Sequence, residues 1–152
     1  MKRSLQFITF SLLFTFFSCK TQEATTSTRK IKLKKTYTTE SGLQYMFTSL
    51  GEGVQPKNGD KVSVHYIGRL TDGKEVDNSH KNGVPISFVL GEQKVIKGLE
   101  EGIALMYVGD KAVITIPSQL GYGSLEIPKL IPANSTLVFE VELLDFVPGS
   151  GN

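Results

Sequence analysis

Two segments of the chain, residues 62–70 and 136–146, alternate between apolar and polar side chains. Successive side chains of a β-strand point to opposite faces, so this pattern predicts two strands that each bury one face. The inward-facing side chains of the second segment would be Leu137, Phe139, Val141 and Leu143. We therefore expect a β-sheet to be the main element of the fold.

One segment, residues 93–106, has the apolar spacing of an amphipathic helix. Apolar side chains recur there three or four residues apart, at Ile96, Leu99, Ile103 and Met106. Gly98 and Gly102 lower the intrinsic stability of a helix by about 1 kcal/mol each. We therefore expect a short helix that depends on packing against other elements.

Shorter strand candidates complete the predicted domain, and they lie at residues 42–49, 75–78, 85–90 and 112–117. The turn Thr71-Asp72-Gly73-Lys74 has the Asp-Gly pair of a β-hairpin connection. Residues 118–135 contain Gly and Pro without a clear period, and we expect them to be irregular. The sequence thus predicts an α+β domain, in which a twisted antiparallel sheet of five or six strands wraps around one short α-helix.

The first 35 residues differ in charge from the rest of the chain. They hold eight Lys and Arg against one Glu, so their net charge is +7, whereas the whole chain has a formal net charge of +2. Lys2 and Arg3 precede a thirteen-residue stretch, Leu5–Phe17, that is mostly apolar. As a helix this stretch would span about 20 Å, too short for a hydrocarbon core of about 30 Å. The pattern is typical of a secretory signal peptide.

Cys19 follows the small residue Ser18, at the place where a signal peptide would be cleaved. This arrangement resembles the bacterial lipoprotein signal, in which the cysteine is lipidated and becomes the first residue of the mature chain. The alternative is an ordinary signal peptide in which Cys19 is incidental.

The residues after Cys19 are rich in Thr, Lys and Ser and predict an extended tether. Its basic side chains could contact anionic lipid head groups, or they could simply keep a charged linker open; they are Arg29, Lys30, Lys32, Lys34 and Lys35. We accordingly divide the chain into a signal peptide at 1–18, a flexible tether at 19–39, a folded domain at 40–148 and a C-terminal tail at 149–152.

The composition argues against several kinds of chemistry. One cysteine cannot form an intramolecular disulfide or a thiolate zinc site, and the two histidines, His65 and His80, lack metal-binding spacing. The chain has neither a phosphate-binding Gly-x-x-x-x-Gly-Lys loop nor a Gly-x-Ser-x-Gly nucleophile motif. We expect His65 to lie on the outward face of its strand, as a solvated or hydrogen-bonded side chain. A function without metal, nucleotide or nucleophile is favoured, and the small net charge argues against nucleic-acid binding.

Five motifs occur in order within the predicted domain. They are Val64-His65-Tyr66-Ile67-Gly68, the run from Asp72 to Ser79, the run from Val95 to Gly102, Tyr122-Gly123, and the run from Leu137 to Leu143. This series resembles the FKBP family of peptidyl-prolyl cis/trans isomerases, over residues 40–147. The resemblance implies a twisted antiparallel sheet wrapped on one helix, and an enzyme that uses no metal and no cofactor.

The resemblance also implies a shallow apolar pocket between helix and sheet. Its walls would be Tyr66, Val76, Ile86, Val95, Ile96 and Phe139, with Leu99 as the floor. The residues implied to be catalytic are Tyr66, Asp77 as a buried carboxylate, and Tyr122 as a hydroxyl that holds the substrate carbonyl. The backbone N–H of Ile96 would be a second donor. Considered singly, Tyr66, Phe139, Ile96 and Leu99 could each be ordinary core residues, and Asp77 could be a turn carboxylate.

Three positions depart from the family pattern, because Leu99 stands where many members carry Trp, Val76 where Phe is usual, and Ile86 where an aromatic residue is common. The pocket should therefore bind proline more weakly. Two functions are considered: an isomerase that accelerates rotation about X–Pro bonds and assists the folding of exported proteins, and a non-catalytic peptide-binding or chaperone module of the cell envelope that uses the same pocket. In either case we expect a monomer that binds proline-containing polypeptides and is lipid-anchored in the bacterial envelope, facing the periplasm.

Overall fold

Seven β-strands and one α-helix make up the part of the chain that the computed structural model describes, residues 29–149. The strands are β1 (Thr36–Thr38), β2 (Gln44–Ser49), β3 (Lys61–Leu70), β4 (Glu75–Asn78), β5 (Ile86–Val89), β6 (Lys111–Ile116) and β7 (Leu137–Val147). The helix is α1 (Lys97–Ala104), and two short 3₁₀ helices are η1 (Ser79–Asn82) and η2 (Ser118–Leu120).

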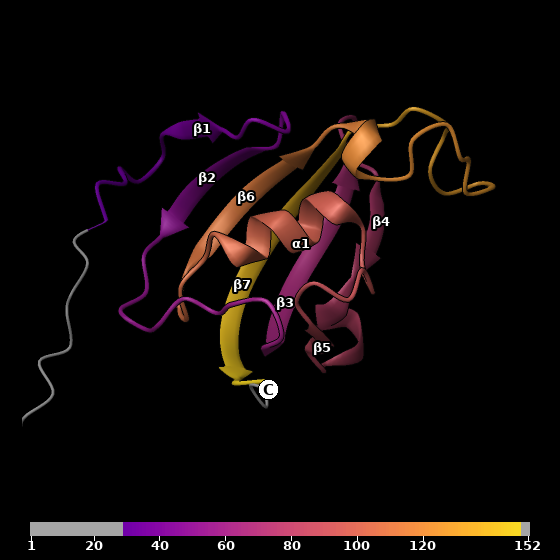
Figure 1. Ribbon diagram of the computed structural model, residues 1–152. Coiled ribbons are helices and arrows are strands. Elements are labelled where there is room, and N and C mark those ends of the chain that lie inside the picture. The colour runs from indigo at the N-terminus through magenta and orange to yellow at the C-terminus, as the bar shows by residue number, and fades with distance from the viewer. Residues whose placement is uncertain (1–28, 150–152) are drawn as a thin grey trace, which may run out of the picture. The chain divides into compact units, whose positions relative to one another are not determined.

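All strand pairs are antiparallel, and the sheet has the order β1-β2-β6-β7-β3-β4, with β5 also paired to β3. Helix α1 lies across one face of this sheet, over β6 and β7 (Figure 1). The predicted α+β class, with an antiparallel sheet on a single short helix, is confirmed. The sheet has one or two strands more than the five or six expected.

The two segments with strict alternation form the central strands β3 and β7, which pair from Lys61↔Val147 to Leu70↔Leu137. Burial follows the alternation along β3, because every second residue from Val62 to Leu70 is buried. Both strands thus turn one apolar face toward α1, and the other face carries most of their polar side chains.

Helix α1 is shorter than expected, because the prediction of a helix over residues 93–106 was wrong at both ends. Gln93 has a positive φ of 55°, and Ile96 is extended with a ψ of 143°, so neither residue continues a helix. Leu99 and Ile103 are buried on the helix face that packs on the sheet, as the spacing predicted.

The expected tether contains strand β1 near its end. Thr36 lies opposite Met46 and Thr38 opposite Gln44, and the Tyr37 ring stacks on Tyr45 with centroids 5.5 Å apart. Backbone pairing and ring contact together order residues that the polar composition alone assigned to a linker.

The predicted signal peptide and Cys19 lie outside the described residues. Within residues 29–149, no helix has the length and apolar character needed to cross a bilayer.

Candidate active site

Tyr66 on β3 and Asp77 on β4 form the polar centre of the site. The Tyr66 hydroxyl donates a hydrogen bond to Asp77 Oδ2, and Asp77 Oδ1 accepts one from the Asn78 N–H at 2.8 Å. The strand register explains the contact: Gly68 lies opposite Asp77, and Tyr66 is two residues away on the same face of β3. Asp77 was expected to be buried, but it is exposed because β4 is an edge strand.

The Tyr66 side chain is only 8% exposed. Burial raises the pKa of its phenol well above the ordinary value, and the hydrogen bond to the Asp77 carboxylate raises that pKa further. The phenol therefore remains a protonated hydrogen-bond donor throughout the neutral pH range.

A cavity of about 320 Å³ opens beside this pair. It is bounded by β4, β7 and the segment that connects η2 to β7, and its lining residues are Val76, Asp77, Tyr122, Ile127, Leu130, Ile131, Leu137 and Phe139. Tyr66 supports one wall, because its ring packs against Phe139 with centroids 5.5 Å apart. The structure thus brings together four residues assigned to the pocket by resemblance: Val76, Asp77, Tyr122 and Phe139.

Gly68 makes room for the Phe139 ring in this wall. A Cβ atom on Gly68 would lie 2.8 Å from Phe139 Cε1, closer than real side chains approach. The glycine in the Tyr66-Ile67-Gly68 motif is therefore required by the ring that packs against it.

Four other predicted pocket residues do not line the cavity: Ile86, Val95, Ile96 and Leu99. Leu99 is 3% exposed and belongs to the core under α1, and the other three are partly buried against that core. The cavity instead lies toward β4 and the 118–135 segment.

The sequence analysis missed the cavity residues Ile127, Leu130, Ile131 and Leu137. Ile127 and Ile131 form an isolated β-bridge that folds the irregular segment back over the pocket. The signal that could have identified this part of the cavity was the apolar pair Leu130 and Ile131 between Pro128 and Pro132. Apolar side chains in a loop usually pack on another surface of the protein or on a ligand.

Two hydrogen-bond donors of the predicted site residues are unused within residues 29–149, one on Tyr122, which lines the cavity, and one on Ile96, which does not. Tyr122 is 39% exposed, and no residue of the described chain bonds to its hydroxyl. The Ile96 N–H, at the first turn of α1, likewise finds no acceptor within residues 29–149. Both groups can bind a carbonyl oxygen of a ligand.

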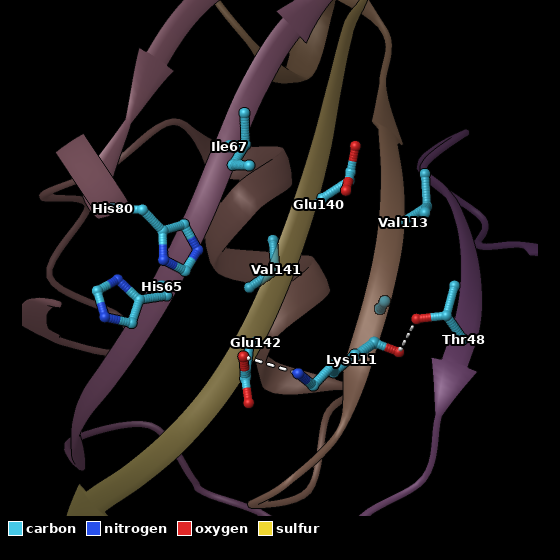
Figure 2. Close-up of a pocket in the computed structure, with 10 residues that line it drawn as sticks. Thr48, His65, Ile67, His80, Lys111, Val113, Glu140, Val141 and Glu142 are labelled. Carbon is cyan, nitrogen blue, oxygen red and sulfur yellow. Dashed lines mark hydrogen bonds and ion pairs between the residues drawn. The ribbon is translucent and has the colours of Figure 1, made fainter. Parts of the chain in front are cut away.

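A second hollow, of about 270 Å³, lies on the opposite face of the sheet (Figure 2). Here the His65 and His80 rings stack with centroids 4.2 Å apart, and Lys111 Nζ lies 3.1 Å from Glu142 Oε2. His65 Nδ1 also forms a 2.9 Å hydrogen bond with Ser79 Oγ, so His65 is the outward, hydrogen-bonded histidine that was predicted. Within residues 29–149, no cluster of three or more His, Cys, Asp or Glu could hold a metal ion.

Comparison with known proteins agrees with the fold. The sequence model of the FKBP-type peptidyl-prolyl cis-trans isomerase family matches residues 52–144. FK506-binding protein 1A of Aspergillus fumigatus is 49% identical over 104 residues, which are 68% of this chain and 93% of that protein. The isomerase FkpA of Escherichia coli K12 is 47% identical over 117 residues, 77% of this chain and 42% of FkpA.

The crystal structure of FkpA from Escherichia coli superposes with a TM-score of 0.70 at 47% identity, covering 77% of this chain and 54% of that one. The chain therefore spans nearly all of the fungal relative, but only about half of the bacterial ones. The family match covers β3, β4, the segment that connects η2 to β7, and most of β7, and these parts of the chain carry the site. The chain belongs to the FKBP-type peptidyl-prolyl cis-trans isomerase family.

Proposed function

We propose that the cavity beside Tyr66 and Asp77 is the site where this chain catalyses cis/trans isomerisation of X–Pro bonds. The observation that carries the proposal is a cavity of about 320 Å³, lined mostly by apolar side chains, with an unbonded tyrosine hydroxyl, Tyr122, at its wall. Its apolar lining suits a pyrrolidine ring, and the hydroxyl suits the carbonyl of the rotating amide.

The chemistry requires neither nucleophile nor metal because no bond is broken. Resonance gives the peptide C–N bond partial double-bond character and a rotation barrier of about 18–20 kcal/mol. An apolar pocket disfavours the charge-separated resonance form, and the twisted amide has lost that form. The transition state is therefore bound better than the planar ground state.

Each polar group has a proposed role in this rotation. The Tyr122 hydroxyl and the Ile96 N–H would donate hydrogen bonds to substrate carbonyls and hold one side of the amide while the other turns. The Tyr66–Asp77 hydrogen bond would fix the polar wall of the pocket. Val76 and Phe139 would contact the proline ring, with Leu99, Val95 and Ile86 supporting them from the core side.

Family membership favours the enzyme over a non-catalytic peptide-binding module. We infer that its clients are proline-containing segments of exported proteins, in which proline isomerisation takes tens of seconds without a catalyst. The apolar segment Leu5–Phe17 and Cys19 support export and a lipid anchor, and the isomerases of bacteria among the relatives support a bacterial setting. Because no acidic cluster follows Cys19, we infer that the anchored chain faces the periplasm. The residues between Cys19 and strand β1 would act as the tether, and the domain would act as a monomer.

An exchange or protease-coupled assay on a short X–Pro peptide tests the activity. The wild-type chain should accelerate isomerisation, and Tyr122→Phe should lower kcat/KM about tenfold, since one hydrogen bond to the carbonyl is lost. Asp77→Ala should lower kcat/KM at least as much. Tyr37→Phe and Asp72→Ala are the matched controls, because both residues lie outside the cavity. No acceleration by the wild type would refute the proposed activity.

A further inference from the structure

Ser79 is a buried polar residue to which the sequence motifs assigned no role of its own. It is 4% exposed and lies at the start of η1, two residues after Asp77. Its Oγ accepts a hydrogen bond from the Tyr66 N–H at 2.8 Å and lies 3.2 Å from the Tyr66 carbonyl oxygen, to which it can donate. One side chain thus holds both backbone groups of the residue that carries the site hydroxyl.

The place of this contact in the sheet explains its importance. The β3–β4 ladder runs from Arg69↔Glu75 through Gly68↔Asp77 and ends at Ile67↔Asn78. Beyond that pair the chain turns into η1, so no β4 backbone group is paired with Tyr66. The Ser79 side chain forms hydrogen bonds with the Tyr66 backbone in place of β4 backbone groups. These bonds lie directly next to the Tyr66–Asp77 contact.

The chain between Ser79 and Asp77 is itself held by hydrogen bonds. Asn78 Oδ1 accepts from the His80 N–H at 2.9 Å, and Asn78 Nδ2 donates to Glu75 Oε2 at 3.1 Å. Asp77 Oδ1 accepts from the Asn78 N–H. A displacement of Ser79 would therefore move the Asp77 carboxylate with it.

We propose that Ser79 is a positioning residue for isomerisation. Its hydrogen bonds to the Tyr66 backbone hold β4 and η1 next to Tyr66, and so keep the Asp77 carboxylate in contact with the Tyr66 hydroxyl. The inference rests on the proposed function of the cavity. His65 completes the hydrogen bonding of Ser79 from the opposite face of the sheet, at 2.9 Å, so the hydrogen bonds of Ser79 span both faces of β3 at this point.

A double-mutant cycle tests this role on the full chain. Ser79→Ala should lower kcat/KM about fivefold, mainly through kcat, because the pocket that binds proline is retained. In the Tyr66→Phe background the same substitution should lower kcat/KM less than about twofold, since the contact that Ser79 positions is already gone. An equal loss in both backgrounds would show a merely structural role and overturn the proposal.

Stability and catalysis are separated by a control and a second readout. Val62→Ala removes a buried side chain at the far end of β3 and should reduce stability without this loss of kcat. A Val62→Ala protein of equal stability that loses as much kcat as Ser79→Ala would also overturn the proposal. Ser79→Cys, with its weaker hydrogen bonds, replaces Ser79→Ala if the alanine variant does not fold.

The second readout does not depend on activity. When the Asp77 contact is lost, the Tyr66 phenol should ionise at a lower pH in Ser79→Ala than in the wild type. NMR of the tyrosine rings follows this ionisation, and the Tyr66→Phe variant identifies the Tyr66 signal. Unchanged ionisation would overturn the positioning role. If the wild-type chain has no isomerase activity, the proposed function fails, while this titration still decides whether Ser79 positions the pair.

Discussion

Gly98 of α1 lies so close to Ile116 of β6 that a Cβ atom on the glycine would be 2.4 Å from Ile116 Cγ2. On the other side, the same atom would be 3.2 Å from Leu120 Cβ. Gly102, one turn later, approaches Ile114 in the same way, with 2.5 Å to Ile114 Cδ1. The two glycines therefore allow α1 to lie directly on β6, which offsets their cost in helix propensity.

Gly98→Ala should consequently destabilise the domain, although alanine is the better helix former by about 1 kcal/mol. Overpacking a buried contact costs about 1–3 kcal/mol, and a Cβ atom only 2.4 Å from Ile116 Cγ2 places this site in the upper part of that range. After the gain in helix propensity, we expect a net loss of about 1–2 kcal/mol in the free energy of unfolding. Chemical denaturation measures it, with the exposed Lys97→Ala as control. The close contact between Gly98 and Ile116 would be contradicted if Gly98→Ala were more stable than the wild type. It would also be contradicted if Gly98→Ala lowered the free energy of unfolding as much in an Ile116→Ala background as in the wild type.

The alkaline pH dependence of stability should carry a contribution from Tyr66. Its folded-state pKa is raised above the unfolded value of about 10, first by burial and then by the bond to Asp77. The unfolded chain therefore releases this proton at lower pH than the folded chain does. The contribution is fully present below pH about 10 and is lost as the pH rises above that value.

Denaturation at a series of pH values between neutral and alkaline measures this effect. The free energy of unfolding should fall less steeply above pH about 10 in Tyr66→Phe than in the wild type. Identical slopes for wild type and Tyr66→Phe would show that the phenol is not held in its protonated form.

Asp110 is a fully buried carboxylate whose role is structural. Its Oδ1 accepts a hydrogen bond from the Gly51 N–H at 2.7 Å, and its Oδ2 accepts one from the Tyr107 N–H at 2.8 Å. Asp110→Asn replaces one acceptor by an NH₂ group that faces a donor, so we expect a loss of about 2–3 kcal/mol in unfolding free energy. The exposed Asp145→Asn should change it by less than about 0.5 kcal/mol. Similar stability of the two variants would contradict this assignment.

Val76→Phe should strengthen substrate binding, because Val76 lines the cavity. About 40 Å² of additional apolar contact contributes about 1 kcal/mol, or about a fivefold lower KM. Steady-state kinetics on an X–Pro peptide measure the change, and Val147→Phe, at an exposed position of β7, is the control. A raised KM would mean that the larger ring occupies the space needed by proline.

Cys19→Ser should release the protein from the membrane fraction if Cys19 carries the anchor. Ser18→Ala keeps a small residue before the cysteine and should leave the protein in that fraction. Cell fractionation with immunoblotting measures both. Membrane retention of Cys19→Ser would refute lipidation at this residue.

Local periodicity predicted the parts of the fold that depend on one segment at a time. The alternation in β3 and β7 and the apolar face of α1, with Leu99 and Ile103, follow from which side chains one element must bury. The resemblance of the ordered motifs indicated Val76, Asp77, Tyr122 and Phe139, which the structure brings to one cavity.

Features that depend on how two segments meet were decided only by the tertiary structure. The Asp72-Gly73 turn predicted that β3 and β4 pair, but the irregularity between Gly68 and Arg69 shifts the register that places Asp77 beside Tyr66 and Ser79 on the Tyr66 backbone. The fold of the 118–135 segment brings Leu130 to the cavity, while Leu99 stays in the core. The physical reason is that periodicity reports which face of an element is buried, whereas the atoms that a buried face meets depend on how strands and helix pack together.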